Sequence, residues 1–155
     1  PVLEQQGIDV IAVDRGGDVT LHAPGQLVAY PVFNLKNYRC DLRWYLDKLE
    51  QVAIDLLTDF DILTCRFPGR TGVWVGSKKI VSIGVGVKHW VTFHGLAINI
   101  NTDLPLFNLI KPCGLEVQMT SVQQLQGTAV DMRIVKQLFQ RHCLRIFTGN
   151  FSPAF

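Results

Sequence analysis

The chain has 155 residues, of which 48% are hydrophobic and 18% are charged, and its formal net charge is +2. This length and composition indicate one globular domain, and a nearly neutral chain without a run of basic residues is not expected to bind nucleic acid. Its apolar stretches, such as Ile80–Val87, are too short to span a membrane. The widely spaced cysteines Cys40, Cys65, Cys113 and Cys143 indicate a reducing, cytosol-like compartment rather than a disulfide scaffold.

The first part of the chain predicts short strands, a glycine-rich loop and one long helix. Ile8–Val13 and Val19–His22 have strand patterns on either side of Gly16-Gly17, and Leu27–Phe33 resumes as a strand. Asp41 stands where a helix N-cap is expected. Apolar residues then recur at steps of three and four, which predicts an amphipathic helix lying on a sheet.

The second part predicts more strands and two further helices. Gly76-Ser77 suits the type II′ turn of a hairpin, and Asp103–Leu115 is expected to be a loop. Capping boxes at Thr120–Gln123 and Thr128–Asp131 predict a short helix ended by Gly127 and a last helix. The strands expected here are Ile62–Arg66, Val73–Val75, Lys78–Val87, Trp90–His94 and Leu96–Asn101, and the last helix is expected to pack through Val130, Ile134, Leu138 and Phe139.

The fold class that follows is α+β, with a mixed, largely antiparallel sheet and two main helices in a single domain. No metal site is expected, because the four histidines and four cysteines show none of the close spacings of such sites. Arg15-Gly16-Gly17 precedes a strand, so no helix N-terminus is available there to hold a phosphate. It is either a tight turn or a loop whose backbone passes close to an extended ligand.

Lys79 and the small residues that follow it suggest a ligand surface. Alternation along a strand predicts that Lys79 shares a face with Val81, and that Ser82 and Gly84 lie on the opposite face, where small side chains leave room for a ligand. Lys79 then either extends to solvent or supplies an amine, held partly away from water, that acts as a base.

Cys113 differs from the other cysteines in its surroundings. Cys65 and Cys143 fall in apolar elements and are expected to be buried structural thiols. Cys113 lies between Pro112 and Gly114 in a loop, where a nucleophilic thiol would be reachable. A structural thiol remains an alternative at this position.

Four ordered blocks of the sequence carry a family resemblance. They are Arg15–Gln26, Gly76–Gly84, Phe93–Asn99 and Pro112–Gly114, and together they resemble the lipoyl(octanoyl) transferases. In that family an octanoyl group passes from acyl carrier protein to a cysteine and then to a lysine of a lipoyl domain, as the first step of protein lipoylation. The resemblance implies the catalytic fold of biotin and lipoate ligases and no cofactor, ATP or metal.

The resemblance also implies the site residues and the partners. Cys113 would form the acyl thioester, and Lys79 would favour its thiolate. The donor would be octanoyl-acyl carrier protein, and the acceptors would be lipoyl domains of 2-oxoacid dehydrogenases and the glycine cleavage H protein, without nucleic acid or membrane. The implied substrate-binding residues are Arg15, Gly16, Gly17, Asp18, Val19, Thr20, Leu21, His22, Ser82, Ile83, Gly84, Gly95, Leu96 and Ala97.

Some features depart from the family pattern. Ala23 stands where the family usually has glycine, and Gly86 stands where arginine is common. The family's strand–helix segment before the Arg-Gly-Gly loop is expected to be largely missing from residues 1–155. The expected location is cytoplasmic, with an organelle left open because the chain starts at Pro1. The alternatives are an ATP-dependent lipoate or biotin protein ligase and a catalytically inactive acyl-carrier-binding module.

Overall fold

A computed structural model describes residue 3 and residues 7–110 and 117–149. One sheet forms its centre, with the strand order β1-β5-β4-β3-β2. The four ladders between neighbouring strands are antiparallel, and an isolated parallel bridge joins Lys79 to Met119. The strands are β1 (Gln26–Ala29), β2 (Cys65–Phe67), β3 (Arg70–Val75), β4 (Lys78–Lys88) and β5 (Val91–Asn99).

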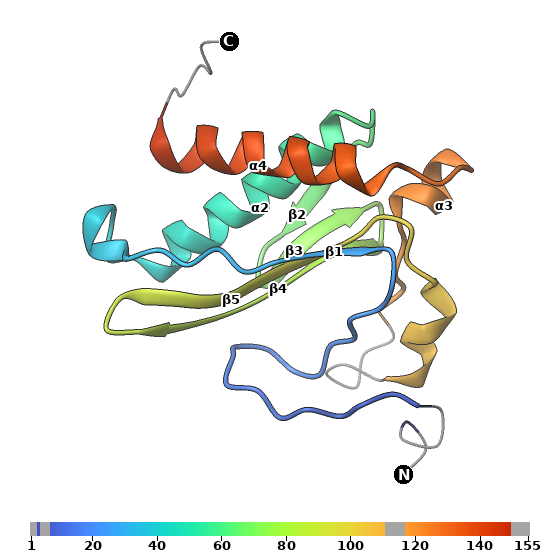
Figure 1. Cartoon of the computed structure of the whole chain (residues 1–155), viewed down its shortest axis with the longest axis horizontal. Coiled ribbons are helices and arrows are strands. Elements are labelled where there is room, and N and C mark those ends of the chain that lie inside the picture. Colours follow the sequence, from blue (N-terminus) through green and yellow to red (C-terminus); the bar gives the residue numbers. More distant parts are fainter. Residues whose placement is uncertain (1–2, 4–6, 111–116, 150–155) are drawn as a thin grey trace.

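Two long helices cover one face of this sheet. They are α2 (Leu42–Thr58) and α4 (Met132–Thr148), and Figure 1 shows both on the same side, with the N-terminal segment on the other side. The shorter elements are α3 (Val122–Gln126) and the 3₁₀ helices η1 (Leu35–Asn37) and η2 (Leu104–Leu109). The predicted α+β class is therefore confirmed. Over the described ranges, none of the helices has the length and apolarity that crossing a membrane requires.

The core lies between the helices and the sheet. As predicted, Asp41 caps α2, since its carboxylate accepts a hydrogen bond from the Trp44 backbone N–H at 3.0 Å. The buried face of α2 includes Leu49 and Leu56, which belong to the same apolar cluster as Val81 of β4. Burial of this face fixes the helix on the sheet.

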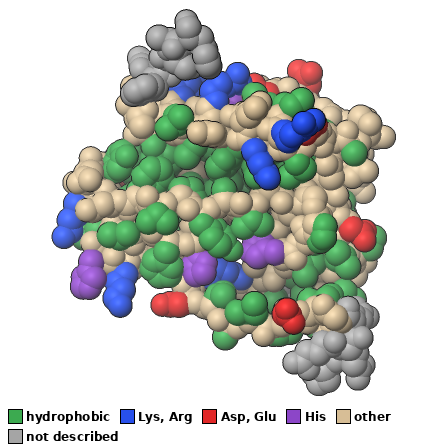
Figure 2. Space-filling model, viewed as in Figure 1, with side chains coloured by type: hydrophobic (Ala, Val, Ile, Leu, Met, Phe, Trp, Pro, Cys, Tyr) green, Lys and Arg blue, Asp and Glu red, His purple; other side chains and the backbone are tan. Residues whose placement is uncertain are grey.

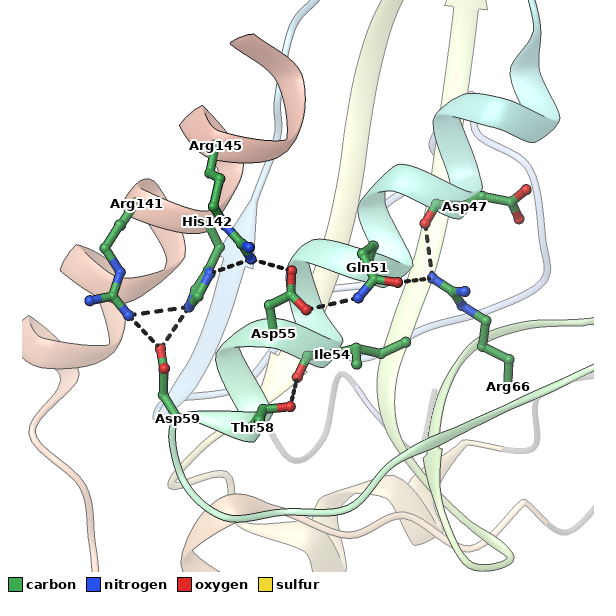
Figure 3. Close-up of polar contacts among 10 residues, drawn as sticks. All are labelled: Asp47, Gln51, Ile54, Asp55, Thr58, Asp59, Arg66, Arg141, His142 and Arg145. Atoms are coloured by element: carbon green, nitrogen blue, oxygen red, sulfur yellow. Dashed lines mark hydrogen bonds and ion pairs between the residues drawn. The ribbon is translucent and has the colours of Figure 1, made fainter. Parts of the chain in front are cut away.

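Polar side chains join α4 to α2 at the edge of this core (Figure 3). Asp59 accepts from Arg141 Nη2 at 3.0 Å and lies 2.6 Å from His142 Nε2, while Asp55 pairs with Arg145 at 2.6 Å. His142 is buried, and its other ring nitrogen lies 3.1 Å from Arg145 Nη2. The network therefore holds the two helices together on the face away from the glycine-rich loop.

The N-terminal strands that the sequence predicts are not strands in the structure. Ile8–Val13 and Val19–His22 are irregular, and Val10 and Ile11 are 67% and 74% exposed. Alternation shows that side chains suit a strand, but a strand also needs a partner for its backbone. The predicted strand Leu27–Phe33 is shortened to β1, which ends before Pro31, a residue that has no N–H to donate.

The later elements are found with shifted limits. The two strands predicted at Trp90–His94 and Leu96–Asn101 are one strand, β5 (Val91–Asn99), and His89 and Trp90 make the preceding two-residue turn with φ of 53° and 69°. The predicted boxes would place the caps at Thr120 and Thr128, whereas Ser121 caps α3 and Asp131 caps α4. The predicted loop at Asp103–Leu115 contains η2, and residues 111–115 lie outside the described ranges.

The buried stripe of the last helix also differs from the prediction. Val135, His142 and Phe147 are its buried residues, whereas Ile134 is half exposed. Leu138 and Phe139 are partly buried against the core, as expected. Ile134 was wrongly assigned because the stripe is centred one residue later, where α4 faces α2.

Candidate active site

An open cleft of about 1190 Å³ lies on the sheet face opposite α2 and α4. On the surface in Figure 2, histidine side chains gather over the lower half of the molecule, away from the helices. The expected site residues that line this cleft are Arg15, Gly17, Asp18, Val19, Thr20, His22, Lys79, Ser82, Ile83, Gly84, Gly95, Leu96 and Ala97. Gly16 and Leu21 belong to the same loop but do not line the cleft, and Leu21 is buried.

The glycine-rich loop rests directly on β4. The Gly16 N–H donates to the Val85 carbonyl at 2.9 Å. A Cβ atom on Gly84 would lie 2.9 Å from both Arg15 Cδ and the Gly16 carbonyl oxygen, so only glycine leaves room for this crossing. The glycine in the strand thus marks a close backbone approach.

Lys79 does not lie on the face that strand alternation predicts. Val73 pairs with Val81, but the next residue, Trp74, pairs with Lys79, which leaves Ile80 as an extra residue in β4. Such a β-bulge reverses the alternation. Ile80 and Val81 both enter the helix-side core, while Lys79 lines the cleft together with Ser82 and Gly84.

The surroundings of Lys79 come from two neighbouring segments. Its Nζ lies 5.4 Å from the centroid of the Trp74 ring, a cation–π distance. Its backbone N–H donates to the Gln118 carbonyl at 2.8 Å, and its carbonyl accepts from the Thr120 N–H at 2.9 Å. The segment that contains Gln118 and Thr120 therefore runs beside Lys79.

Gly72 gives the Lys79 side chain its space. A Cβ atom on Gly72 would lie 2.6 Å from Lys79 Cε, and the glycine has φ of 123°, which other residues rarely adopt. The Gly72 N–H donates to Glu50 Oε1 of α2 at 2.9 Å, and Glu50 Oε2 pairs with Arg66 at 3.0 Å. The helix layer thereby holds the backbone beneath Lys79.

Aromatic side chains from three segments meet at the other end of the cleft. Tyr30 packs edge-on against His94, with ring centroids 5.5 Å apart, and its hydroxyl lies 3.3 Å from His22 Nε2. His94 has φ of 56° in the middle of β5. Such strain in a non-glycine residue is typical of functional sites.

Cys113 lies outside the described residues, so its predicted role stays a prediction. Among the described cysteines, Cys40 is exposed and Cys65 and Cys143 are partly buried, and all three are free thiols. Burial raises the pKa of the Cys143 thiol, which disfavours a nucleophilic thiolate. Within the described ranges, no group of three or more His, Cys, Asp or Glu residues could hold a metal ion.

Tyr30 and Trp74 line the cleft but were missed by sequence reasoning. Trp74 could have been found, because a two-residue turn at Gly76-Ser77 pairs Val75 with Lys78 and therefore Trp74 with Lys79. Tyr30 carried no such signal, because its place depends on the irregular segment after β1.

The sequence matches known proteins over most of its length. The family model for the lipoyl protein ligase A/B catalytic domain matches residues 1–144. An octanoyltransferase of Solibacter usitatus is 46% identical over 152 residues, which are 98% of this chain and 69% of that protein. An octanoyltransferase of Pelobacter propionicus is 49% identical over 130 residues, 83% of this chain and 62% of that protein. The chain thus spans about two thirds of the length of these relatives.

Solved structures share the fold at low identity. A bipartite lipoate protein ligase from Thermoplasma acidophilum has a TM-score of 0.74 and 15% identity, over 94% of this chain and 60% of that chain. A biotin protein ligase from Aquifex aeolicus has a TM-score of 0.64 and 17% identity, over 80% of this chain and 53% of that chain. The chain belongs to the lipoyl protein ligase A/B catalytic domain family, with octanoyltransferases among its relatives.

Proposed function

We propose that this chain is the catalytic domain of an octanoyltransferase. It transfers an octanoyl group from acyl carrier protein to Cys113 as a thioester, and then to a lysine of a lipoyl domain. The observation that carries this proposal is the cleft in which Lys79 and the glycine-rich loop line one space. The octanoyltransferases among its relatives support the reaction class.

The path of the chain supports a pairing of Cys113 with Lys79. Gln118, whose carbonyl accepts from the Lys79 N–H, comes five positions after Cys113 in the sequence. A fully extended chain advances at most ~3.6 Å per residue, so the Cα atoms of Cys113 and Gln118 lie within about 18 Å of each other. This short link supports the proposed pairing of two positions that are 34 residues apart in sequence.

In the first half-reaction, Cys113 attacks the thioester carbonyl of the donor. The neutral amine of Lys79 takes the thiol proton, and the thiolate forms the new C–S bond. The carrier's sulfur leaves and receives that proton. Backbone N–H groups near the nucleophile or near His94-Gly95 would stabilise the tetrahedral oxyanion.

In the second half-reaction, the amine of the acceptor lysine attacks the acyl-enzyme. The C–N bond forms and the bond to Cys113 Sγ breaks. Lys79 takes a proton from the attacking nitrogen and passes it to the leaving sulfur, which regenerates the thiol. This sequence of steps needs neither ATP nor a metal ion.

The lining of the cleft supports an acyl chain as its occupant. The glycine-rich loop Arg15–His22 passes over β4, where Ser82 and Gly84 present little side chain, and Gly95 and Ala97 lie beside them on β5. Arg15-Gly16 already fills the space over Gly84, and Ala29 and Pro31 fill the space over Gly95, so an extended apolar chain would lie close to the backbone beside Ser82 and Ala97. We assign the octanoyl group to this surface.

The partners follow from the same reaction. The donor is octanoyl-acyl carrier protein, and the acceptors are lipoyl domains of 2-oxoacid dehydrogenases and the glycine cleavage H protein. We propose a cytoplasmic location, because the three described cysteines are free thiols, as is usual in a reducing compartment.

The mass of the acyl-enzyme tests the proposal. Protein mixed with octanoyl-acyl carrier protein and no acceptor should gain one octanoyl group on Cys113, and Cys113→Ser should not accumulate that thioester. Lys79→Ala should slow the gain, because the lysine only raises the thiolate fraction. Acylation of Cys40, Cys65 or Cys143 instead would identify a different thiol, and unchanged transfer by Cys113→Ala would exclude the covalent route.

A second assay separates this function from the ligases that share its fold. Protein incubated with free octanoate, ATP and a lipoyl domain should form no product without a thioester donor. Product formation under these conditions would favour an ATP-dependent ligase. Binding of acyl carrier protein without any acyl transfer would favour an inactive binding module.

A further inference from the structure

A chain of hydrogen bonds runs from the cleft into the core. Tyr30 Oη lies 3.3 Å from His22 Nε2, and His22 Nδ1 lies 2.9 Å from Gln26 Oε1. Gln26 Nε2 donates to Asn99 Oδ1 at 2.9 Å, and Asn99 Nδ2 donates to the Thr120 carbonyl at 3.1 Å. The series of hydrogen bonds thus links four side chains from three segments and ends at the backbone carbonyl of Thr120.

That carbonyl fixes the direction of every bond in the chain. A carbonyl oxygen only accepts, so the Asn99 amide must turn its NH₂ group toward Thr120 and its oxygen toward Gln26. Gln26 must then donate to Asn99 and present its own oxygen to His22. His22 Nδ1 can only be the donor, and it carries the ring proton.

A second backbone carbonyl imposes the same orientation on the Gln26 amide. Gln26 Nε2 also lies 3.4 Å from the Leu21 carbonyl, which again only accepts. Asn99 is 1% exposed, so no solvent is available to satisfy an inverted amide. The two carbonyls therefore select the Nδ1–H tautomer of neutral His22, in which Nε2 keeps a free electron pair.

The cleft around His22 Nε2 suits a primary ammonium group. His22, Tyr30 and His94 all line the cleft, and the Tyr30 and His94 rings lie edge to face. A nitrogen electron pair accepts a proton or hydrogen bond from an ammonium, and aromatic faces attract a cation. The contact that Tyr30 Oη makes with Nε2 is long enough to be exchanged for a better donor.

We propose that Gln26 and Asn99 are positioning residues that fix this tautomer, and that His22 Nε2 accepts the first proton of the acceptor lysine. This inference rests on the proposed function. A lysine ammonium loses two protons when it becomes an amide nitrogen. His22 takes one before the attack and becomes imidazolium, and the other leaves the tetrahedral adduct through Lys79 to the Cys113 sulfur. The imidazolium then releases its proton to water.

Nitrogen NMR tests the tautomer without any assay of activity. In ¹⁵N-labelled protein at a pH where the ring is neutral, His22 should show a protonated Nδ1 and an unprotonated Nε2. Gln26→Leu removes the acceptor, and Asn99→Leu removes the group that orients it, so both should shift the ring toward the Nε2–H form. Gln126→Leu, whose amide bonds the Phe60 carbonyl away from the cleft, should change nothing. An Nε2–H ring in the unsubstituted protein would overturn the proposal.

Single-turnover kinetics test the role of His22 in the second half-reaction. His22→Ala should pass the octanoyl group to a lipoyl domain about 10²-fold more slowly, and should slow acyl-enzyme formation from octanoyl-acyl carrier protein much less. Gln26→Leu should show the same split with a smaller loss. Equal slowing of both half-reactions would overturn the proposal. Failure of the unsubstituted protein to form any acyl-enzyme would overturn the proposed function, and the nitrogen spectrum would still report on the tautomer.

Discussion

At the level of single residues, two glycines make room for other parts of the cleft. Gly84 allows the Arg15-Gly16 loop to cross β4, and Gly72 leaves the space that the Lys79 side chain fills. At each glycine, an added Cβ atom would lie too close to a neighbouring atom. The absence of a side chain at these positions is therefore part of the site.

Replacing Gly72 by alanine should disturb Lys79 as well as the fold. The new Cβ would meet Lys79 Cε and the Val81 carbonyl, at a φ of 123° that alanine avoids. We expect the free energy of unfolding to fall by about 1–3 kcal/mol, measured by urea unfolding, and acylation of Cys113 to slow. Gly69→Ala is the control, because Gly69 has φ of 76° but no atom within 4 Å of its Cβ position. Equal effects of both variants would show that backbone strain alone is responsible.

Glu50 should contribute through the same contact. Its buried carboxylate accepts from the Gly72 N–H and pairs with Arg66. Glu50→Ala leaves that N–H without its acceptor, and should lower the free energy of unfolding by about 1–3 kcal/mol. Glu50→Gln keeps an oxygen for Gly72 and should lose less. Urea denaturation of both variants checks this order, and the two variants would lose equally if only the charge of Glu50 mattered.

At the level of elements, Tyr45 joins α2 to the irregular chain after β1. Its hydroxyl donates to the Pro31 carbonyl at 3.0 Å, which also accepts from Thr92 Oγ1 at 3.0 Å. Burial raises the pKa of Tyr45 from 10.0 to about 12, against the opposing effect of the Thr92 hydrogen bond. The tyrosine thus stays neutral in the folded protein at a pH where it ionises in the unfolded chain.

Alkaline pH should therefore weaken the fold through Tyr45. A raised folded-state pKa gives stability that is complete below pH 10.0 and is lost as pH rises through about 12. The free energy of unfolding should fall by up to about 1.4 kcal/mol per pH unit in that window. Tyr45→Phe should flatten this dependence in urea unfolding measured across the window. An unchanged slope would assign the alkaline loss to other groups.

The elements also show which parts of the fold the sequence predicts. The helix after Asp41 and the hairpin at Gly76-Ser77 follow from local signals, a cap and a turn, and both are present. The bulge at Ile80 has no local signal, because it depends on how β3 and β4 pack on the helices, and it turns Lys79 toward the cleft. The Val19–His22 pattern failed as a strand because strand formation depends on a distant partner.

At the level of the whole molecule, the sheet lies between the apolar core, which stabilises the fold, and the cleft proposed for catalysis. Its helix-side face carries the apolar core and the α2–α4 polar network (Figure 3), and its other face carries the cleft. Most of the candidate site residues that the structure describes were implied by the family resemblance, which rests on motifs in loops and strands. Tyr30, Gln26 and Asn99 could not be placed in the site from the sequence, because their contacts join segments up to 73 residues apart.

Substitutions on the two faces should therefore have different effects. Leu49→Ala, in the fully buried helix face, should lower the free energy of unfolding by about 2–5 kcal/mol. Octanoyl transfer by the folded fraction should be retained, because Leu49 does not line the cleft. Gly84→Ala should lower stability less than Leu49→Ala and should slow octanoyl transfer. Its Cβ would push the Arg15-Gly16 loop off β4, with a stability loss of about 1 kcal/mol for the Gly16–Val85 hydrogen bond.

Urea unfolding and octanoyl-transfer rates, measured on the same preparations, check this separation. The transfer rate of Gly84→Ala should fall by more than its loss of stability accounts for, because the loop that it displaces borders the surface assigned to the acyl chain. If Leu49→Ala lost activity per folded molecule as strongly as Gly84→Ala, the sheet would be transmitting changes in the helix layer to the cleft. The site would then depend on the core as a whole rather than on the loop contact at Gly84.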